Sequence, residues 1–261
     1  MSERVKIILD KNADILRLPA IALRGLVVFP GNIIHFEVGR KKSIAAIEWA
    51  MSNNNAVFLT AQQDMDVEDP GFKDLYAYGV VAEVKQVLRV SDELVKVLVE
   101  GKYRAKLLTL DSSGRFLLAS TKAAALRGTK SVDSARMEAL VRSVKEVFEE
   151  YLSLNPRLSK DVVYTIITNE DAALLCDYIP ANLLLKYTDK QALLNEGTVS
   201  GRLEKLLEIL RRETKILHIE KDIQSKVNEQ MDKNQRDYYL REQMRAISNE
   251  LDDFDDTREE A

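Results

Sequence analysis

Cysteine is almost absent from this sequence, since Cys176 is the only one in 261 residues. A single thiol cannot form a bridge within the chain, so the fold needs neither disulfides nor an oxidising compartment. No uninterrupted apolar run approaches the roughly 20 residues that span a bilayer. The first residues carry charges throughout and lack the apolar segment and small-residue cleavage site of a secretory signal. We therefore expect a cytoplasmic protein without a membrane partner.

An excess of positive charge is also missing. Acidic residues outnumber basic ones by 42 to 38, which gives a formal charge of -4. The chain as a whole therefore does not attract phosphate backbones, and nucleic acid is not the expected partner. The hydrophobic fraction of 46% is that of a globular protein, and the charged fraction of 31% lies somewhat above the usual quarter. A chain of this length and composition can bury one large core or two ordinary ones.

Known catalytic and metal-binding signatures are missing too. Gly101-Lys102 lacks the glycine five residues earlier that a phosphate-binding loop needs, because Lys96 stands there. The sequence contains no GxSxG, HExxH or CxxC pattern. His35 and His218, its two histidines, cannot form a metal site by themselves. Cys176 lies among apolar residues, which favours a buried, inert thiol. We expect no catalytic residue, no metal and no cofactor in this chain.

The first 120 residues have the pattern of β-strands separated by turn residues. Alternation around Ser91-Asp92 predicts a hairpin, and residues 41–55 have the periodicity of a single helix. Strands are expected at 21–31, 33–39, 56–61, 78–90 and 93–101, with two more between 103 and 124 around Asp111 to Gly114. These elements predict a small, twisted, mostly antiparallel sheet or partly closed barrel over residues 1–120.

Beyond about Thr121 the hydrophobic period changes from two to nearly four. Residues 134–154 place apolar side chains on one stripe and end at Asn155-Pro156. Shorter helices are expected at 159–168, 169–179 and 188–195, with Pro180 stopping the second of them. Thr188 and Gln191 have the spacing of a capping box at the start of the third. Because such short helices are marginal alone, residues 121–200 are predicted to form a helical bundle.

A helical pattern without interruption follows over residues 201–250. At about 1.5 Å per residue it predicts a rod on the order of 75 Å long. Its first half carries a leucine stripe, whereas its second half has only a narrow seam of Ile223, Val227 and Met231. Acid-before-base pairs stabilise such a helix by about 0.3 to 0.5 kcal/mol each, namely Glu229 with Lys233, Asp232 with Arg236 and Asp237 with Arg241. Residues 251–261 are strongly acidic and are expected to form a solvated linker.

The second half of this rod has too little burial to be stable by local pairing alone. Apolar and aromatic side chains continue along it where no further part of the chain is expected to cover them. We predict that they bind a partner: Met231, Tyr238, Tyr239, Leu240 and Met244. The alternative is that the end of the helix frays.

Several segments resemble the amino-terminal region of Lon proteases, which are ATP-dependent serine proteases. The similar segments are LPAIALRGLVVFPGNIIHFEVGRKKSIAAIE (18–48), VLVEGKYRAKL (97–107), DKQALL (189–194) and QMDKNQRDYYLREQMRAISNEL (230–251). Together they run through the chain in the order of the family. Departures occur at Ala22, where a second proline is usual, at Gly25, where Asp is common, and at Asp252, where Gly usually follows Glu-Leu.

The resemblance implies an α+β protein: a PUA-like, partly closed β barrel, then a helical bundle and a long C-terminal helix. It also implies an isolated amino-terminal region, since a full-length Lon continues into an AAA+ ATPase, which uses ATP and Mg, and a protease domain. Such a region captures unfolded or damaged proteins and has no turnover of its own. In the family enzyme the long helices meet around the entrance of a hexamer.

Combined with this resemblance, the apolar segments of the β domain suggest where substrates bind. We predict apolar patches near Leu26, Phe29, Ile34 and Leu88 that recognise the hydrophobic segments of non-native proteins. The stretch from Leu26 to Pro30 is then a partly exposed apolar edge that accepts an unfolded chain as an added strand or on a sticky surface. The other interpretation of this stretch is a core strand, and Leu88 can likewise belong to the core.

Two other functions compete with substrate capture. PUA-like folds occur in RNA-binding proteins, and the long helix carries Lys226, Lys233, Arg236, Arg241 and Arg245. Acidic residues interleave with these bases, so no continuous basic stripe forms. A self-contained hydrolase is disfavoured by the missing motifs.

Overall fold

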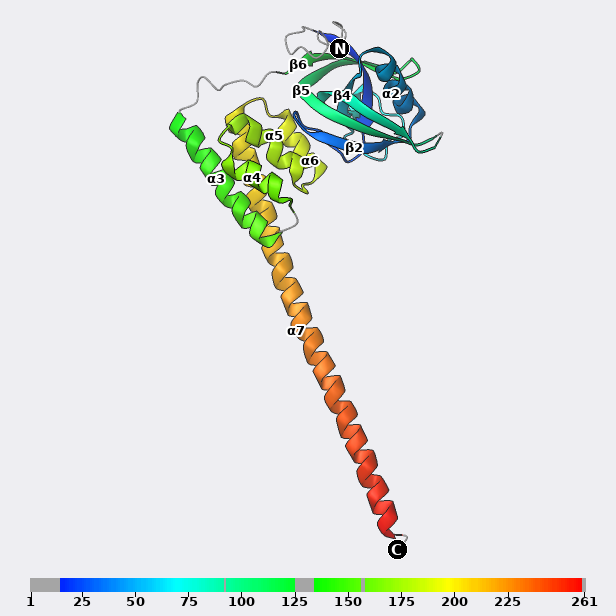
Figure 1. Cartoon of the computed structure of the whole chain (residues 1–261), viewed down its shortest axis with the longest axis vertical. Coiled ribbons are helices and arrows are strands. Elements are labelled where there is room, and N and C mark those ends of the chain that lie inside the picture. The colour runs from blue at the N-terminus through cyan, green and yellow to red at the C-terminus, as the bar shows by residue number, and fades with distance from the viewer. Residues whose placement is uncertain (1–14, 92, 125–133, 156–157, 260–261) are drawn as a thin grey trace.

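The computed structural model describes residues 15–91, 93–124, 134–155 and 158–259, with side chains described up to residue 247. A strand-rich part lies at one end, a group of helices beside it, and one long helix projects away from both (Figure 1). The strands are β1 (Leu16–Leu23), β2 (Ile33–Val38), β3 (Ala56–Ala61), β4 (Tyr78–Arg89), β5 (Val95–Asp111) and β6 (Leu117–Ala123). The helices are α2 (Lys41–Asn53), the short 3-10 turn η1 (Phe72–Asp74), α3 (Ser134–Leu154), α4 (Lys160–Thr168), α5 (Ala172–Asn182), α6 (Tyr187–Asn195) and α7 (Val199–Glu259).

The six strands form one mixed sheet that curls into a partly closed ring. Their order is β2-β5-β4-β3-β1-β6, and β5 also pairs with β6, which closes the ring. Only the β1–β3 pair is parallel, and the other described pairs are antiparallel. This confirms the predicted mostly antiparallel, partly closed barrel. Of the six described strands, β2 pairs with β5 alone and therefore lies at an edge of this sheet.

The longest strand, β5, is where the sequence prediction of separate strands differs from the structure. Residues 95–111 form one continuous strand of 17 residues rather than two, and this strand pairs with β2, β4 and β6 in turn. Register shifts against β4 and β6 bend it. Bulges of this kind increase local twist and curvature, which allows one strand to pair with three neighbouring strands.

The segment between β1 and β2 is buried without being a strand. The predicted strand at 21–31 ends at Leu23, and Val27, Val28 and Phe29 follow as buried, irregular backbone. This segment lies against β5, because the backbone N–H of Gly31 donates to the carbonyl of Gly101 at 2.8 Å. A Cβ at Gly101 would lie 2.2 Å from the carbonyl oxygen of Phe29. Glycine at this position is therefore required for the close approach.

The helices α3 to α6 pack around the first part of α7 and form the predicted bundle (Figure 1). Two local predictions within it were wrong. Pro180 lies inside α5, which continues to Asn182 instead of stopping. Lys186 precedes α6 without a side-chain cap, so Thr188 and Gln191 do not form a capping box. The side chain of Gln191 is instead buried, and its Nε2 donates to the carbonyl of Tyr78 on β4 at 2.8 Å.

The long helix α7 has 61 residues, so at about 1.5 Å per residue it extends roughly 90 Å. Its first part is buried against the bundle through Leu203, Leu206 and Leu210. Every described side chain from His218 to Ile247 is exposed. The helix continues to Glu259, so most of the predicted linker at 251–261 is helical.

The predicted acid–base pairs of α7 are not closed in this structure. Over residues 218–247, where the side chains are described, the pairs formed at this spacing are amides. Gln224 donates to Asn228 at 2.9 Å and Gln230 donates to Asn234 at 3.2 Å. Contacts of this kind contribute only about 0.2 to 0.5 kcal/mol each. Local pairing therefore gives the projecting half of α7 little stability.

Candidate functional site: a groove between two strand edges

Two strands of the sheet leave an edge unpaired on the same side of the ring. The pairing of β1 with β6 ends at Ala20, so among the described strands residues 21–23 of β1 pair with β3 alone. Likewise, β2 pairs only with β5 among them. Apart from the carbonyl of Ala22, which accepts from Arg40, such edges present backbone N–H and C=O groups that can accept a further strand.

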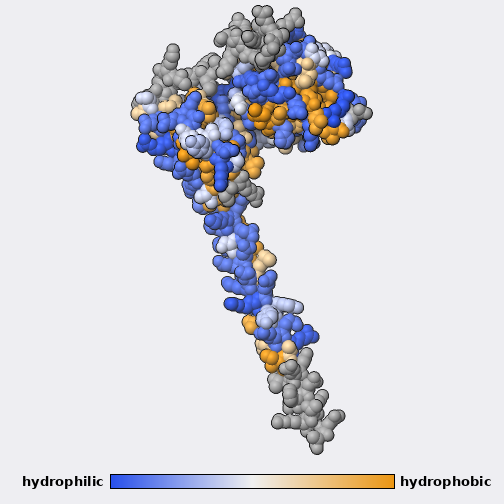
Figure 2. Space-filling view, viewed as in Figure 1, coloured by the Kyte–Doolittle hydropathy of each residue, from blue (hydrophilic) through white to orange (hydrophobic). Residues whose placement is uncertain are grey.

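A groove of about 460 Å³ lies between these two edges. We name it the β1–β2 groove, and its lining is Ile21, Ala22, Leu23, Arg24, Leu26, Phe36, Glu37, Val38, Gly39, Arg40 and Ser43. Most of these residues are apolar, with two arginines and one carboxylate among them. Figure 2 shows that apolar surface also gathers at the sheet end of the molecule, whereas the projecting helix is mostly hydrophilic.

Arg40 is the polar group that organises the groove. Its Nη1 donates to the carbonyl of Ala22 at 3.3 Å, and its Nη2 donates to Oε1 of Gln62 at 2.5 Å and to the carbonyl of Val67 at 3.2 Å. Burial, together with the nearby charge of Arg24, lowers the pKa of the Arg40 guanidinium. Arg40 therefore ties β1 to the loop after β3 and satisfies a carbonyl in the groove wall.

The four predicted substrate-binding residues do not form one patch. Leu26 is half-buried and lines the β1–β2 groove. Ile34 is half-buried and packs against the main core, opposite Val99 of β5. Leu88 is 58% exposed and lies near the β4–β5 hairpin, away from the groove lining. Of the predicted set, only Leu26 belongs to this groove.

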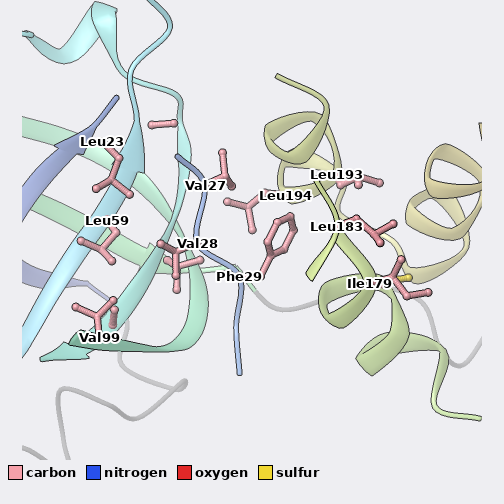
Figure 3. Close-up of a cluster of buried hydrophobic side chains, with 14 of the residues drawn as sticks. Leu23, Val27, Val28, Phe29, Leu59, Val99, Ile179, Leu183, Leu193 and Leu194 are labelled. Carbon is pink, nitrogen blue, oxygen red and sulfur yellow. The ribbon is translucent and has the colours of Figure 1, made fainter. Parts of the chain in front are cut away.

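The prediction that Phe29 belongs to an exposed patch was wrong. Its side chain is 0% exposed and joins the sheet to the helical bundle. In Figure 3 the ring lies between Val27 and Val28 on one side and Leu183 and Ile179 on the other, with Leu194 next to it. The alternative assignment of this stretch to the core is correct, although its backbone is not a strand.

The predicted partner-binding residues of α7 are all exposed, by 49 to 72%. At about 3.6 residues per turn, they divide between two faces of the helix. Met231 and Tyr238 are seven residues apart and continue a seam with Ile216, Ile219, Ile223 and Val227. Leu240 and Met244 are four residues apart and lie on nearly the opposite side, with Ile247, while Tyr239 lies between the two faces. The helix therefore presents two separate apolar surfaces.

Sequence reasoning missed a group of charged side chains buried between the sheet and the bundle. Arg104 on β5 is 4% exposed and Arg202 on α7 is 0% exposed. Nη1 of Arg202 donates to Oδ1 of Asp177 at 2.6 Å. The alternation of 102, 104 and 106 along β5 assigns Arg104 to the solvent face, and only the docking of α6 and α7 buries it.

No catalytic constellation accompanies these features in the described part of the chain. Its His, Cys, Asp and Glu side chains form no group of three or more that could hold a metal ion. Cys176 is fully buried, and burial together with Asp177 raises the pKa of its thiol, which opposes nucleophilic use. None of the described helices is long and apolar enough to cross a membrane.

The partly closed β ring, helical bundle and emerging helix together define the fold of Lon N-terminal domains. The N-terminal domain of a Mycobacterium avium complex Lon protease superposes with a TM-score of 0.61 at 20% identity, covering 75% of this chain and 98% of that one. A Lon N-terminal domain protein from Xanthomonas campestris superposes with a TM-score of 0.52 at 15% identity, covering 74% and 98%.

The sequence places the chain within a family. A family model described as the ATP-dependent protease La (LON) substrate-binding domain matches residues 17–212, and the chain belongs to this family. It is 38% identical over 250 residues to Lon protease of Escherichia coli K12 and 39% identical over 239 residues to Lon protease of Brevibacillus choshinensis. These matches cover 96% and 91% of the chain but only 32% and 30% of the relatives. The chain thus spans about a third of the length of the curated relatives it matches, and the matched part is the substrate-binding domain.

Proposed function

We propose that this chain is the substrate-recognition and assembly region of a cytoplasmic ATP-dependent protease, and that an extended segment of an unfolded protein binds in the β1–β2 groove. The observation that carries this proposal is the pair of unpaired strand edges facing one apolar groove. The family of substrate-binding domains to which the chain belongs supports it.

Strand addition explains how such a groove selects unfolded chains broadly. Backbone N–H and C=O groups of an extended segment pair with a strand edge whatever its sequence, while alternate side chains enter the apolar groove. A folded protein rarely offers a free extended segment. The groove therefore distinguishes non-native from native proteins without reading a fixed motif.

The strength of this contact is modest. Burying about 300 Å² of apolar surface at ~25 cal/mol per Å² contributes on the order of 7 kcal/mol before the costs of association. One groove therefore binds weakly, and several grooves in one assembly gain from avidity.

Replacing Leu26 with serine is expected to weaken binding of an extended apolar peptide about tenfold, which corresponds to about 1.4 kcal/mol of lost apolar contact. Fluorescence anisotropy of a labelled peptide with alternating apolar residues measures the affinity. The matched control is Leu184→Ser, because Leu184 is 81% exposed on the helical side of the molecule. A third variant, Leu88→Ser, tests the predicted contact at the hairpin.

The same titration tests strand addition directly. A peptide of the same sequence, N-methylated at alternate residues, cannot donate to a strand edge and should lose most of its affinity. Equal binding by the Leu26→Ser and Leu184→Ser variants would rule out the groove. Undiminished binding of the methylated peptide would rule out strand pairing but leave apolar capture in place.

The projecting half of α7 serves assembly in this proposal. Its exposed seam of Ile216, Ile219, Ile223, Val227, Met231 and Tyr238 gains burial when another copy of the chain covers it. The second surface, at Leu240 and Met244, is available to a different neighbour. Two contact surfaces on one helix suit a ring, in which each subunit meets two others.

Substituting aspartate for both Met231 and Tyr238 is expected to raise the dissociation constant of self-association at least about tenfold, because charge is placed in the seam. Sedimentation velocity over a range of concentrations measures this constant. At concentrations where the chain is monomeric, the melting temperature should not change, since both side chains are then exposed. Aspartate at Ser225 and Asn228, which are exposed and lie outside both surfaces, adds the same charge and should leave association unchanged. Equal effects of the two pairs would show that charge, rather than the seam, controls association.

A further inference from the structure

Another pocket lies where β4, β5 and β6 meet the end of α6 and the loop between α6 and α7. It encloses about 630 Å³. We name it the β5–β6 basic pocket, and its lining is Tyr78, Arg104, Lys106, Leu108, Lys122, Ala123, Ala124, Asn195, Gly197 and Thr198. Three of these residues are cationic and none is acidic. The pocket shares no residue with the β1–β2 groove.

Two of the cations face each other directly. Lys106 of β5 and Lys122 of β6 are register partners, and both are exposed. Like charges at directly opposed positions of an antiparallel pair are destabilising. Neither ammonium group forms an ion pair among the residues that the structure describes. An arrangement of this kind is stabilised by an anion held between the two lysines.

The third cation, Arg104, is buried and only partly satisfied. Its Nη2 donates to the carbonyl of Leu194, and its guanidinium lies 5.7 Å from the centroid of the Tyr78 ring. Within the described part of the chain its Nε and Nη1 have no hydrogen-bond partner, although the residue is only 4% exposed. A buried, unpaired charge is costly, and its field is weakly screened by solvent.

The acidic residues near Arg104 already have other partners. Asp177 accepts from Arg202 at 2.6 Å. Oε1 of Glu196 accepts from the backbone N–H and the hydroxyl of Thr198, at 3.1 and 3.0 Å, just before α7 begins. The first turn of this long helix adds the positive end of its dipole beside the pocket.

We propose that the β5–β6 basic pocket binds a small oxyanion of the phosphate class. A phosphate group carries several acceptor oxygens and enough negative charge to bridge Lys106 and Lys122. The positive charge of Arg104 adds to the attraction. The pocket volume admits two linked phosphate groups. An anion bound here contacts the sheet and the α6–α7 loop together, so it also stabilises the junction between the sheet and the bundle.

Isothermal titration of the 261-residue chain with pyrophosphate tests the site, at constant ionic strength. Replacing both lysines, Lys106→Gln with Lys122→Gln, should weaken binding at least about tenfold, through loss of two charge-assisted contacts. The control pair is Lys226→Gln with Lys233→Gln on the exposed part of α7, and it should bind as the parent does. Arg104→Gln is a poor test, because loss of a buried residue can unfold the junction.

Thermal melting provides a second measurement on the same proteins. Pyrophosphate should raise the melting temperature of the parent and of the control pair, but not that of the Lys106/Lys122 pair.

ADP in place of pyrophosphate separates two sources of the phosphate: equal affinity assigns recognition to the phosphates alone, and tighter binding assigns it to a nucleotide. The proposal is overturned if the parent does not bind at millimolar pyrophosphate, or if both lysine pairs bind equally. Peptide binding in the β1–β2 groove is measured separately, so failure of one site leaves the other standing.

Discussion

Replacing Phe29 with alanine is expected to lower the free energy of unfolding by about 3 to 5 kcal/mol, the usual cost of removing a fully buried phenyl ring. The ring is 0% exposed and belongs to the core cluster that continues from the sheet into the helical bundle. Its backbone cannot shift to fill the resulting cavity, because the carbonyl of Phe29 lies against Gly101. The cost should therefore fall in the upper half of this range.

Urea denaturation followed by circular dichroism measures the change, and Phe72→Ala serves as the control. Phe72 is 47% exposed at the start of η1, so its loss should cost less than about 1 kcal/mol. Peptide binding at low urea should survive the Phe29 substitution, since this residue lies outside the groove lining. If the Phe29→Ala protein is as stable as the parent but cannot bind peptide, the result would contradict a core role and support the substrate-binding role predicted for Phe29 from the sequence.

Phe29 also shows the limit of reading burial from a local pattern. The run from Leu26 to Phe29 is apolar without alternation, so it could equally be a buried segment or a sticky edge. Its burial depends on Leu183, Leu193 and Leu194, which lie more than 150 residues later in the chain. Alternation along β4 and the stripe of α3 needed no such distant partner, and the sequence predicted both elements almost to the residue.

The β1–β2 groove could be predicted only in part. Its apolar residues were visible in the sequence, and strand addition was one of the interpretations of the stretch that contains Leu26. The groove itself arises because β6 pairs with β1 only as far as Ala20 and because β2 has one neighbour among the strands that the structure describes. Strand order and the ends of strand pairing are set by the whole ring, and no local pattern encodes them.

The burial of charged side chains at the junction between the sheet and the bundle could not be predicted from local sequence either. A sequence rich in charge leads to the expectation that each charge is solvated, and Arg202 and Asp177 carry no local mark of burial. Arg202 is nevertheless 0% exposed, and besides Asp177 its Nε donates to the carbonyl of Glu196 at 2.9 Å. These bonds connect the start of α7 to α5 and to the α6–α7 loop.

Arg202→Met is accordingly expected to destabilise the chain by about 3 to 5 kcal/mol, because it leaves the carboxylate of Asp177 buried without its cation. Burial already raises the pKa of Asp177 to about 7, against the opposing charge of Arg104. Loss of Arg202 raises it further. The unfolded carboxyl ionises near its ordinary value, whereas the folded one stays protonated until higher pH. The penalty is therefore small in mild acid and grows as pH rises through neutrality.

A double-mutant cycle separates the ion pair from the packing around it. Asp177→Leu with Arg202→Met removes both charges, so it should recover at least half of the stability lost by Arg202→Met alone, with a coupling energy of about 2 kcal/mol. Full recovery is not expected, since the carbonyl of Glu196 still loses the donor that Arg202 provided. Urea midpoints at about pH 5 and pH 8 measure the dependence on pH. The stability lost by Arg202→Met should be smaller at pH 5 than at pH 8, whereas the stability lost by the double variant should be the same at both. If the deficit of Arg202→Met is independent of pH and adds to that of Asp177→Leu, the two side chains stabilise the junction through packing alone.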